Sequence, residues 1–206
     1  MTPNRLPAGY FEALYRREAD PWQFATRWYE RRKRALTLAA LPRPRYRHAF
    51  EPGCGIGTLT AELAHVCDRI TATDITDEPL RTAALRLGDG ADTVDFTVWA
   101  LGDDWPGTQF DLIVFSEVCY YLDGDELRIA LDRTVEHLEP DGTLLCVHWL
   151  HPAPDYPLSG EQVHMIVAEH PGLVRLARYR DEDMLLEVFT PVAGDQRSVA
   201  QREGIV

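Results

Sequence analysis

The chain has 206 residues, 45% of them hydrophobic, and a formal net charge of −12 at pH 7. This length and composition predict one substantial core, and the acidic balance argues against a nucleic-acid partner because such a surface repels phosphates. The chain has no apolar run near the roughly 18 residues of a membrane span, and its four cysteines lack C-x-x-C spacing. We therefore expect a reduced, cytoplasmic protein with no membrane partner.

Hydrophobic periodicity predicts strands and helices that alternate along most of the chain. In chain order we expect helices over residues 9–17 and 22–40, a strand over 48–50, a helix over 58–66, a strand over 69–73, a helix over 78–87, strands over 93–99 and 111–115, a helix opened by Asp123-Gly124-Asp125-Glu126, a strand over 144–148, a short helix after Gly160, and strands over 173–180 and 184–192. This order predicts a Rossmann-like α/β fold, with a mostly parallel sheet of seven strands, an antiparallel C-terminal hairpin and helices on both faces. We expect a single domain over residues 1–206, with a helical cap over 1–45, an α/β core over 46–192 and a polar tail over 193–206.

A run of basic residues, Arg31-Arg32-Lys33-Arg34, lies in the second predicted helix. Because Trp28, Leu36 and Leu38 supply the apolar positions of that helix, the run is typical of a solvated helix face. A contact with nucleic acid stays as an alternative reading of the same charges.

Three glycines alternate in the loop after the first predicted strand, in the order Glu51-Pro52-Gly53-Cys54-Gly55-Ile56-Gly57. Glycines let such a loop turn sharply and present bare backbone to a ligand at the start of the next helix. A dinucleotide site needs G-x-G-x-x-G, whereas here the third glycine comes one residue early. The carboxylate of Glu51 would also repel a pyrophosphate and attract an ammonium or sulfonium. The loop therefore predicts a site for a cationic nucleoside, with Gly53, Gly55 and Gly57 in an ordinary tight turn as the alternative.

The second predicted strand ends at Asp74, about 20 residues after the loop, where a carboxylate can accept hydrogen bonds from both ribose hydroxyls. A helix cap is the alternative role. The glycine loop and this acid resemble the first motifs of the class I S-adenosylmethionine-dependent methyltransferases, which implies S-adenosylmethionine as the cofactor. In that class the third strand usually brings an Asp to the adenine, but Ala100 stands at this place. We therefore expect backbone groups around Ala100 and Leu101 to hold the adenine, with Ile75 as a further cofactor contact.

A narrower resemblance rests on short segments spread along the chain: Asp20-Pro21-Trp22, Trp28-Tyr29-Glu30-Arg31-Arg32-Lys33, Phe110-Asp111-Leu112, Ser116-Glu117-Val118, Tyr120-Tyr121-Leu122 and His148-Trp149-Leu150-His151-Pro152. With the glycine loop, they resemble the nodulation protein S (NodS) family over roughly residues 10–165. That family is known as N-methyltransferases that modify the free amine of a deacetylated chitooligosaccharide. The resemblance implies an enzyme that methylates a small molecule, and we expect N-methylation of an aminosugar or a natural-product amine. The alternatives are O- or S-methylation of a small metabolite and a non-catalytic regulator that binds S-adenosylmethionine.

Methyl transfer is an in-line displacement, and an amine acceptor must lose its proton before or during the attack. Glu117 follows the fourth predicted strand, beside the expected sulfonium, and is the first candidate for the base; binding ligand hydroxyls or pairing with an Arg is its alternative role. His148 ends the fifth predicted strand and is the second candidate, because its intrinsic pKa suits proton acceptance. Its alternative role is a hydrogen-bonded loop anchor. We expect Ser116 to contact the cofactor, and the substrate to contact Tyr120, Tyr121 and His151.

Aromatic side chains on the N-terminal helices are expected to cover the cofactor as a lid: Tyr10, Phe11, Tyr15, Trp22, Trp28 and Tyr29. Since aromatic faces attract cations, Trp22 and Tyr29 are the expected cofactor contacts, and Arg32 is expected to clasp the methionine carboxylate as a fork. Aromatic stripes at helical spacing are also typical of a protein core, which is the alternative for these residues. No metal is expected, although zinc held by a set of four residues is an alternative: His148, His151, Asp155 and His164.

Overall fold

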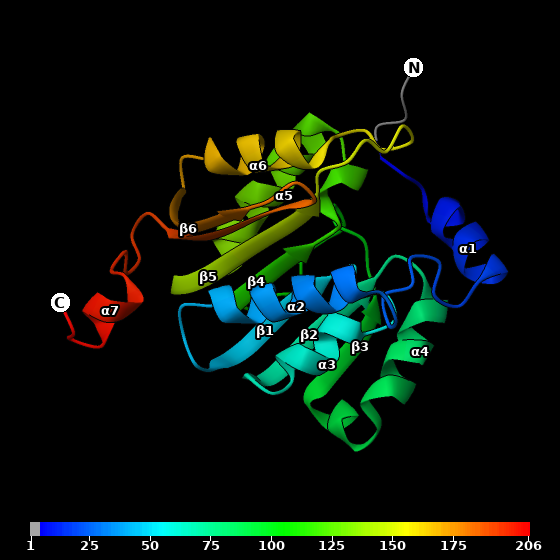
Figure 1. The fold of residues 1–206 in the computed structure, drawn as a ribbon, viewed down its shortest axis with the longest axis horizontal. Coiled ribbons are helices and arrows are strands. Elements are labelled where there is room, and N and C mark those ends of the chain that lie inside the picture. The colour runs from blue at the N-terminus through cyan, green and yellow to red at the C-terminus, as the bar shows by residue number, and fades with distance from the viewer. Residues whose placement is uncertain (1–4) are drawn as a thin grey trace.

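One sheet of seven strands organises the computed structural model, which describes residues 5–206 (Figure 1). The strands are β1 (Tyr46–Pro52), β2 (Cys67–Asp74), β3 (Val94–Val98), β4 (Phe110–Ser116), β5 (Leu138–Trp149), β6 (Leu173–Arg180) and β7 (Met184–Pro191). Their order across the sheet is β3-β2-β1-β4-β5-β7-β6; β1 to β5 are parallel, and β7 is antiparallel to both β5 and β6. The predicted fold is confirmed, and the strand order reverses between β1 and β4.

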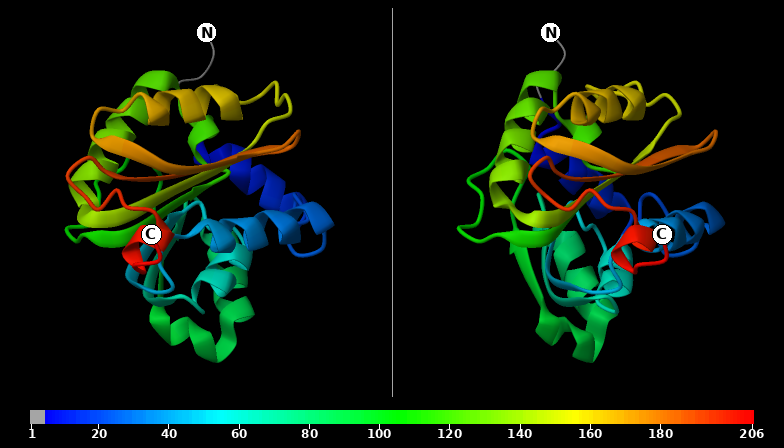
Figure 2. Two further views of the ribbon diagram at one scale, coloured as in Figure 1. Left: turned by 60° about the vertical axis from the view of Figure 1, so that its left-hand side comes forward. Right: turned by 90° about the vertical axis from the view of Figure 1, so that its left-hand side faces the viewer.

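Helices cover both faces of this sheet (Figures 1 and 2). One face packs against α2 (Trp28–Ala40), α3 (Thr58–Leu63) and α4 (Asp77–Leu87), and the other packs against α5 (Gly124–His137) and α6 (Gly160–Ala168). The remaining helical elements are α1 (Ala8–Arg17), η1 (Gly88–Thr93), η2 (Cys119–Tyr121) and α7 (Val199–Arg202). Across residues 5–206, every helix is too short or too polar to cross a bilayer.

The central strand β4 shows why both faces of the sheet need cover. Its side chains alternate between two apolar clusters, so that Ile113 and Phe115 pack on the side of α5 and α6 while Leu112 and Val114 pack on the side of α3 and α4. Side chains of successive strand residues point to opposite faces, and a parallel strand that is apolar on both faces must be buried on both. Ligand access is therefore left at the carboxyl ends of the strands, where the polar residues are.

The second predicted helix begins at Trp28 rather than at residue 22. The carboxylate of Asp20 accepts hydrogen bonds from the backbone N–H groups of Phe24 (2.8 Å) and Ala25 (3.0 Å), which holds this segment as a turn. Gln23 has a φ of 59°, in the left-handed region, so a right-handed helix cannot pass through it. The turn places residues 22 to 24 beside the carboxyl ends of the strands instead of on a helix.

Candidate active site

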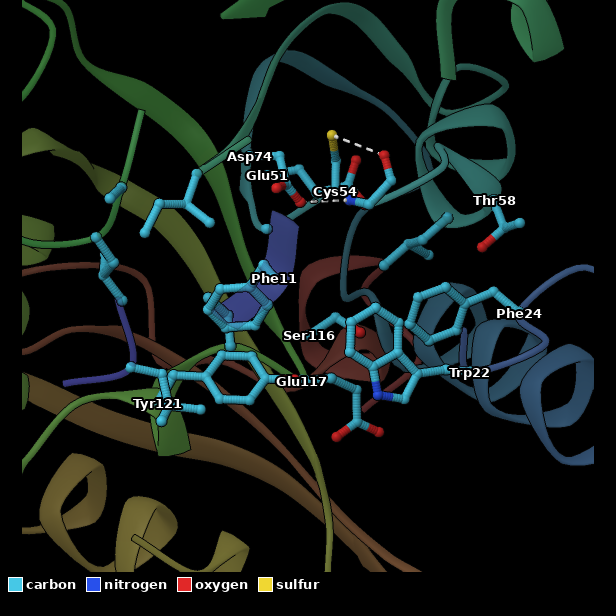
Figure 3. Close-up of a pocket in the computed structure, with 18 of the residues that line it drawn as sticks. Phe11, Trp22, Phe24, Glu51, Cys54, Thr58, Asp74, Ser116, Glu117 and Tyr121 are labelled. Atoms are coloured by element: carbon cyan, nitrogen blue, oxygen red, sulfur yellow. Dashed lines mark hydrogen bonds between the residues drawn. The ribbon is translucent and has the colours of Figure 1, made fainter. Parts of the chain in front are cut away.

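A cavity lies where the carboxyl ends of β1, β2 and β4 meet the N-terminal segment (Figure 3). Its volume is about 990 Å³, which includes the open space at its mouth. Phe11, Tyr15 and Phe24 contribute to its wall on the side of that segment, and Trp22 stacks on Phe24 with ring centroids 5.4 Å apart. Trp28, which was expected in the lid, is 69% exposed instead. Most of the residues predicted from the sequence line this cavity: Trp22, Glu51, Gly53, Gly55, Asp74, Ile75, Ala100, Leu101, Ser116, Glu117 and Tyr121.

The glycine loop has two different structural roles along its length. Gly55 has a φ of 53°, and a Cβ at this position would lie 3.3 Å from the Tyr15 hydroxyl, so glycine lets the loop pass directly under the lid. Gly57 has a φ of 73°, and a Cβ there would lie 2.6 Å from the Cβ of Ala83 on α4. Gly57 is not part of the cavity wall. The structure therefore gives Gly57 a role in the close packing of α3 against α4, and its contact with the cofactor stays a prediction.

Asp74 ties the end of β2 to the glycine loop. Its Oδ2 accepts a hydrogen bond from the backbone N–H of Gly55 at 3.1 Å, and its Oδ1 accepts from the N–H and the hydroxyl of Thr76, both at 3.0 Å. Burial raises the pKa of Asp74, and these hydrogen bonds oppose the shift. A carboxylate offers about four acceptor positions, so one of them is left for a ligand that enters the cavity.

Glu51 is a buried carboxyl group at the wall of the cavity, across from Trp22 and Tyr121 (Figure 3). It is 2% exposed, and its Oε2 has no hydrogen-bond partner among residues 5–206. Burial raises the pKa of Glu51 to about 8, and the nearby hydroxyl of Thr60 opposes the shift. An unpaired buried carboxyl group costs free energy, and a cation in the cavity would relieve that cost by stabilising the charged form.

The inward face of α2 is charged, contrary to the expected solvated face. Glu30, Lys33, Arg34 and Thr37 are buried at helical spacing, and the first three line the cavity. The Nζ of Lys33 lies 3.0 Å from Glu30 and 2.6 Å from Glu117. Desolvation disfavours the charge on Lys33, but the two carboxylates outweigh it, so the pKa of Lys33 is raised. The interpretation of the basic run as solvated is therefore wrong for Lys33 and Arg34.

Glu117 connects four parts of the fold at the edge of the cavity. Its Oε1 accepts from Lys33 at 2.6 Å, and its Oε2 accepts from the hydroxyl of Tyr120 at 2.6 Å and from the backbone N–H of Trp149 at 2.9 Å. Its φ of 57° is unusual for a residue other than glycine. These contacts occupy three of the about four acceptor positions of the carboxylate, and its charge is already paired with Lys33. The geometry favours an anchoring role for Glu117 over the expected role as the base.

His148 does not reach the cavity. It is 0% exposed, and its Nε2 accepts a hydrogen bond from the backbone N–H of Cys119 at 3.3 Å. A buried side chain with this contact is not within reach of an acceptor in the cavity, so the structure favours the alternative of a loop anchor over the expected role of His148 as a base. The structure does not bring the four residues of the zinc alternative together, because His151 pairs with Asp183 at 2.8 Å instead of joining His148. Residues 5–206 contain no group of three or more potential ligands arranged to hold a metal ion.

The expected substrate residues divide between two cavities. Tyr121 lines the first, whereas Tyr120 and His151 line a second cavity of about 660 Å³, counted to its mouth. Trp149 and Tyr156 add aromatic walls to the second cavity. The hydroxyl of Tyr120 and the backbone N–H of Trp149 both bind Glu117 Oε2, so these two hydrogen bonds form part of the wall between the cavities.

Arg32 points away from the cavity, toward the β6–β7 hairpin. Its guanidinium binds Asp181 at 2.6 Å and the hydroxyl of Tyr179, and it is not part of the cavity wall. This placement does not bring Arg32 to the cavity, and its expected clasp of a methionine carboxylate stays a prediction. Arg34 lines the cavity instead: one of its Nη atoms donates to the carbonyl of Phe24 at 2.9 Å, and its buried Nε has no partner among the described residues. Tyr29, the other expected contact on this helix, packs edge-on against Trp149 and lies outside the cavity wall.

The opposite end of the cavity includes two N-terminal residues that sequence reasoning missed. Arg5 donates to the carbonyl of Leu101 at 3.5 Å, and the backbone N–H of Leu6 donates to the carbonyl of Tyr121 at 3.0 Å. The backbone N–H of Ala100, at the expected adenine position, donates to the side chain of Asp103 at 3.0 Å. No signal in the sequence links residues 5 and 6 to this site, because their partners lie about a hundred positions away.

Comparison with known proteins decides the family of this chain. The family model described as "Nodulation protein S (NodS)" matches residues 11–149. The chain belongs to the nodulation protein S family. Its predicted recognition as a class I S-adenosylmethionine-dependent methyltransferase is confirmed by this match and by the solved relatives.

Two curated members and two solved structures show the extent of the similarity. Nodulation protein S of Bradyrhizobium diazoefficiens is 33% identical over 148 residues, which are 65% of this chain and 68% of the relative. Nodulation protein S of Sinorhizobium fredii is 29% identical over 169 residues, 73% of this chain and 74% of the relative. The N-methyltransferase NodS of Bradyrhizobium japonicum WM9, solved with S-adenosyl-L-homocysteine, is 27% identical with a TM-score of 0.78, and the match covers 88% of this chain and 98% of that one. A solved protein from Pseudomonas syringae is 44% identical with a TM-score of 0.68, over 80% of this chain and 99% of its own.

Proposed function

We propose that this methyltransferase acts on the amine nitrogen of a small molecule. The observation that carries the proposal is the chemistry of the cavity wall: it holds four carboxyl groups beside Arg5, Lys33 and Arg34, and Glu117, the carboxylate that follows β4, is already held by three hydrogen bonds. The carboxyl groups are Glu30, Glu51, Asp74 and Glu117. An amine with a pKa of about 8 to 10 supplies some neutral, nucleophilic nitrogen near neutral pH, whereas an alcohol needs a base to activate it.

The residues along the cavity fit the parts of S-adenosylmethionine. Glu51 would bind the ammonium group of the methionine portion, and the guanidinium of Arg34 would bind its carboxylate. Asp74 would accept a hydrogen bond from one ribose hydroxyl with its remaining acceptor position. Backbone near Leu101, with the side chains of Ile75 and Arg5, would surround the adenine. The bound cofactor supplies an activated methyl group on a positively charged sulfur.

The remaining groups suit the acceptor. Ser116 and Glu117 end β4, and the negative charge of Glu117 would attract a cationic amine toward the methyl group. The second cavity, with Tyr120, Trp149 and His151, would hold the body of the acceptor next to this edge. A solved relative named as an N-methyltransferase supports nitrogen as the acceptor atom.

The proposal is tested with purified protein, S-adenosylmethionine and matched acceptors that differ only in the nucleophilic atom. Glucosamine and glucose form one pair, and tyramine and 4-hydroxyphenylethanol form another. Mass spectrometry should find a gain of one methyl group on the amines alone. The rate should rise with pH until the amine is mostly neutral, because positioning without a base leaves deprotonation to the solvent. Methylation of the alcohols would point to O-methylation, while tight binding of S-adenosylhomocysteine without turnover of any amine would support the non-catalytic alternative.

A further inference from the structure

Three buried polar side chains form a chain of hydrogen bonds that begins at the edge of the cavity and runs along the face of the sheet covered by α6. His148 on β5, His164 on α6 and Glu187 on β7 are 0%, 2% and 1% exposed. Burying polar groups costs free energy, and well-packed apolar side chains of similar volume often stabilise a protein as well or better. Stability therefore gives no sufficient reason for this chain of residues. Its role must lie in what its hydrogen bonds hold in place.

The positions of the protons in this chain follow from its two ends. The backbone N–H of Cys119 can only donate, so the Nε2 of His148, at 3.3 Å, carries no proton. Neutral His148 must then carry its proton on Nδ1, which donates to the Nε2 of His164 at 3.2 Å. His164 in turn carries its proton on Nδ1 and donates to Glu187 at 2.8 Å. All three hydrogen bonds thus run in one direction, from Cys119 to the carboxylate.

The charges around the chain favour this arrangement. Burial, together with the charge of Lys33, holds the pKa of His148 well below its usual value, so the ring stays neutral. Burial alone would raise the pKa of Glu187, but the hydrogen bonds from His164 and Arg175 reverse the shift and lower it. The guanidinium of Arg175 binds the other oxygen of Glu187 at 2.8 Å. The carboxylate is therefore charged and acts as a fixed acceptor at one end.

The other end of the chain holds the turn of residues 117–121 at the cavity edge. Cys119 starts η2, and the ring of Tyr120 packs edge-on against His148 with centroids 5.3 Å apart. The same turn carries Glu117, whose left-handed backbone needs support, and Tyr121, which lines the first cavity. Contacts from His148 thus reach both the backbone and a side chain of the segment that borders the two cavities.

We propose that His148, His164 and Glu187 are positioning residues, whose directed hydrogen bonds hold the turn of residues 117–121 in the geometry that methyl transfer requires. The effect of this positioning on catalysis rests on the proposed function. The hydrogen-bond arrangement itself does not, so the two can be tested apart.

The first experiment uses NMR of the whole protein with ¹⁵N-labelled histidine at pH 7. The ring nitrogen shifts of His148 and His164 should show two neutral rings, each with its proton on Nδ1. The amide of Cys119 should exchange slowly with solvent in the wild type and faster in His148→Leu and His164→Leu. A proton on the Nε2 of His148, or an unchanged Cys119 exchange rate in both variants, would overturn the proposal whether or not the protein methylates amines.

The second experiment separates positioning from stability. His148→Leu fills the buried space without an acceptor for the Cys119 N–H, whereas His148→Gln can restore that acceptor with its amide oxygen. With saturating glucosamine or tyramine, whichever is methylated, kcat should fall about 10- to 100-fold in His148→Leu and largely recover in His148→Gln. Affinity for S-adenosylhomocysteine should change less than threefold in both variants. The matched control is His65→Leu, at an exposed position, which should keep full activity.

The outcomes of the kinetic experiment are distinct. If kcat of a folded His148→Leu equals that of the wild type, the positioning role is refuted. If the loss of kcat is not recovered by His148→Gln and follows the melting temperature across the variants, the chain is structural only. If His148→Leu fails to fold, His164→Leu takes its place, because it removes the middle link and keeps His148 itself.

Discussion

Proton release from Glu51 should make cofactor binding depend on pH. Its carboxyl group is buried, its Oε2 has no partner among residues 5–206, and its pKa is raised to about 8. A cationic ammonium group at this place favours the ionised form, so binding must remove the proton whenever the pH lies below 8. Affinity should therefore rise with pH toward 8 and fall as the pH decreases. S-adenosylhomocysteine is the ligand of choice because it keeps the ammonium group and lacks the sulfonium charge.

The size of the effect follows from the pKa. If only the ionised form of Glu51 binds, the apparent Kd scales with 1 + 10^(8 − pH), where about 8 is the pKa of this group. The factor is about 100 at pH 6, about 11 at pH 7 and about 4 at pH 7.5. The Kd should thus fall about 24-fold between pH 6 and pH 7.5, and about 0.9 proton should be released per ligand bound at pH 7. Throughout this range the α-amino group of the ligand stays mostly cationic, because its pKa lies above pH 7.5.

Isothermal titration calorimetry between pH 6 and pH 7.5 measures both quantities. Repeating the titration at pH 7 in phosphate and in Tris gives the number of protons released, because the two buffers differ in ionisation enthalpy. The control is Glu51→Gln, a neutral variant of nearly equal size, which should bind more weakly at pH 7 and show neither the pH dependence nor the proton release. A wild-type Kd that stays within twofold across this range, with no proton released, would refute the assignment of Glu51 to the ammonium group.

Three further predictions concern the cavity and the loop beneath it. Asp74→Ala should weaken binding of S-adenosylhomocysteine by about 1–3 kcal/mol by leaving a ribose hydroxyl unpaired, and an unchanged affinity in calorimetry would reject the assignment. Gly57→Ala should lower the free energy of unfolding in urea by about 2–4 kcal/mol, because its Cβ would lie 2.6 Å from Ala83 at a φ of 73°. In the double variant with Ala83→Gly, only the part of the lost stability that comes from the steric clash should be recovered. Full recovery of the free energy of unfolding would argue against backbone strain. Arg34→Met should weaken binding of S-adenosylhomocysteine about tenfold while Arg32→Met leaves it unchanged, and the opposite result would favour Arg32 as the clasp.

The sequence alone determined the fold and the cofactor edge of the site. Strand and helix periodicity are local properties, and their alternation leaves few ways to build a sheet with helices on both faces. Gly53, Gly55 and Asp74 were placed for the same reason, since each follows a strand whose carboxyl end must lie at one edge of the sheet. Even the family could be named from short motifs, because several of those motifs follow the carboxyl ends of strands.

Only the tertiary structure decided which polar side chains face the cavity. Four basic residues in a row occupy every side of a helix, so the pattern could not tell that Lys33 and Arg34 point inward and Arg32 outward. His148 stands at a strand end like a catalytic residue, yet α6 covers its side of the sheet and turns it into an anchor for Cys119. These outcomes depend on how separate elements pack against one another, and helix rotation and sheet cover are not encoded in the spacing of any one segment.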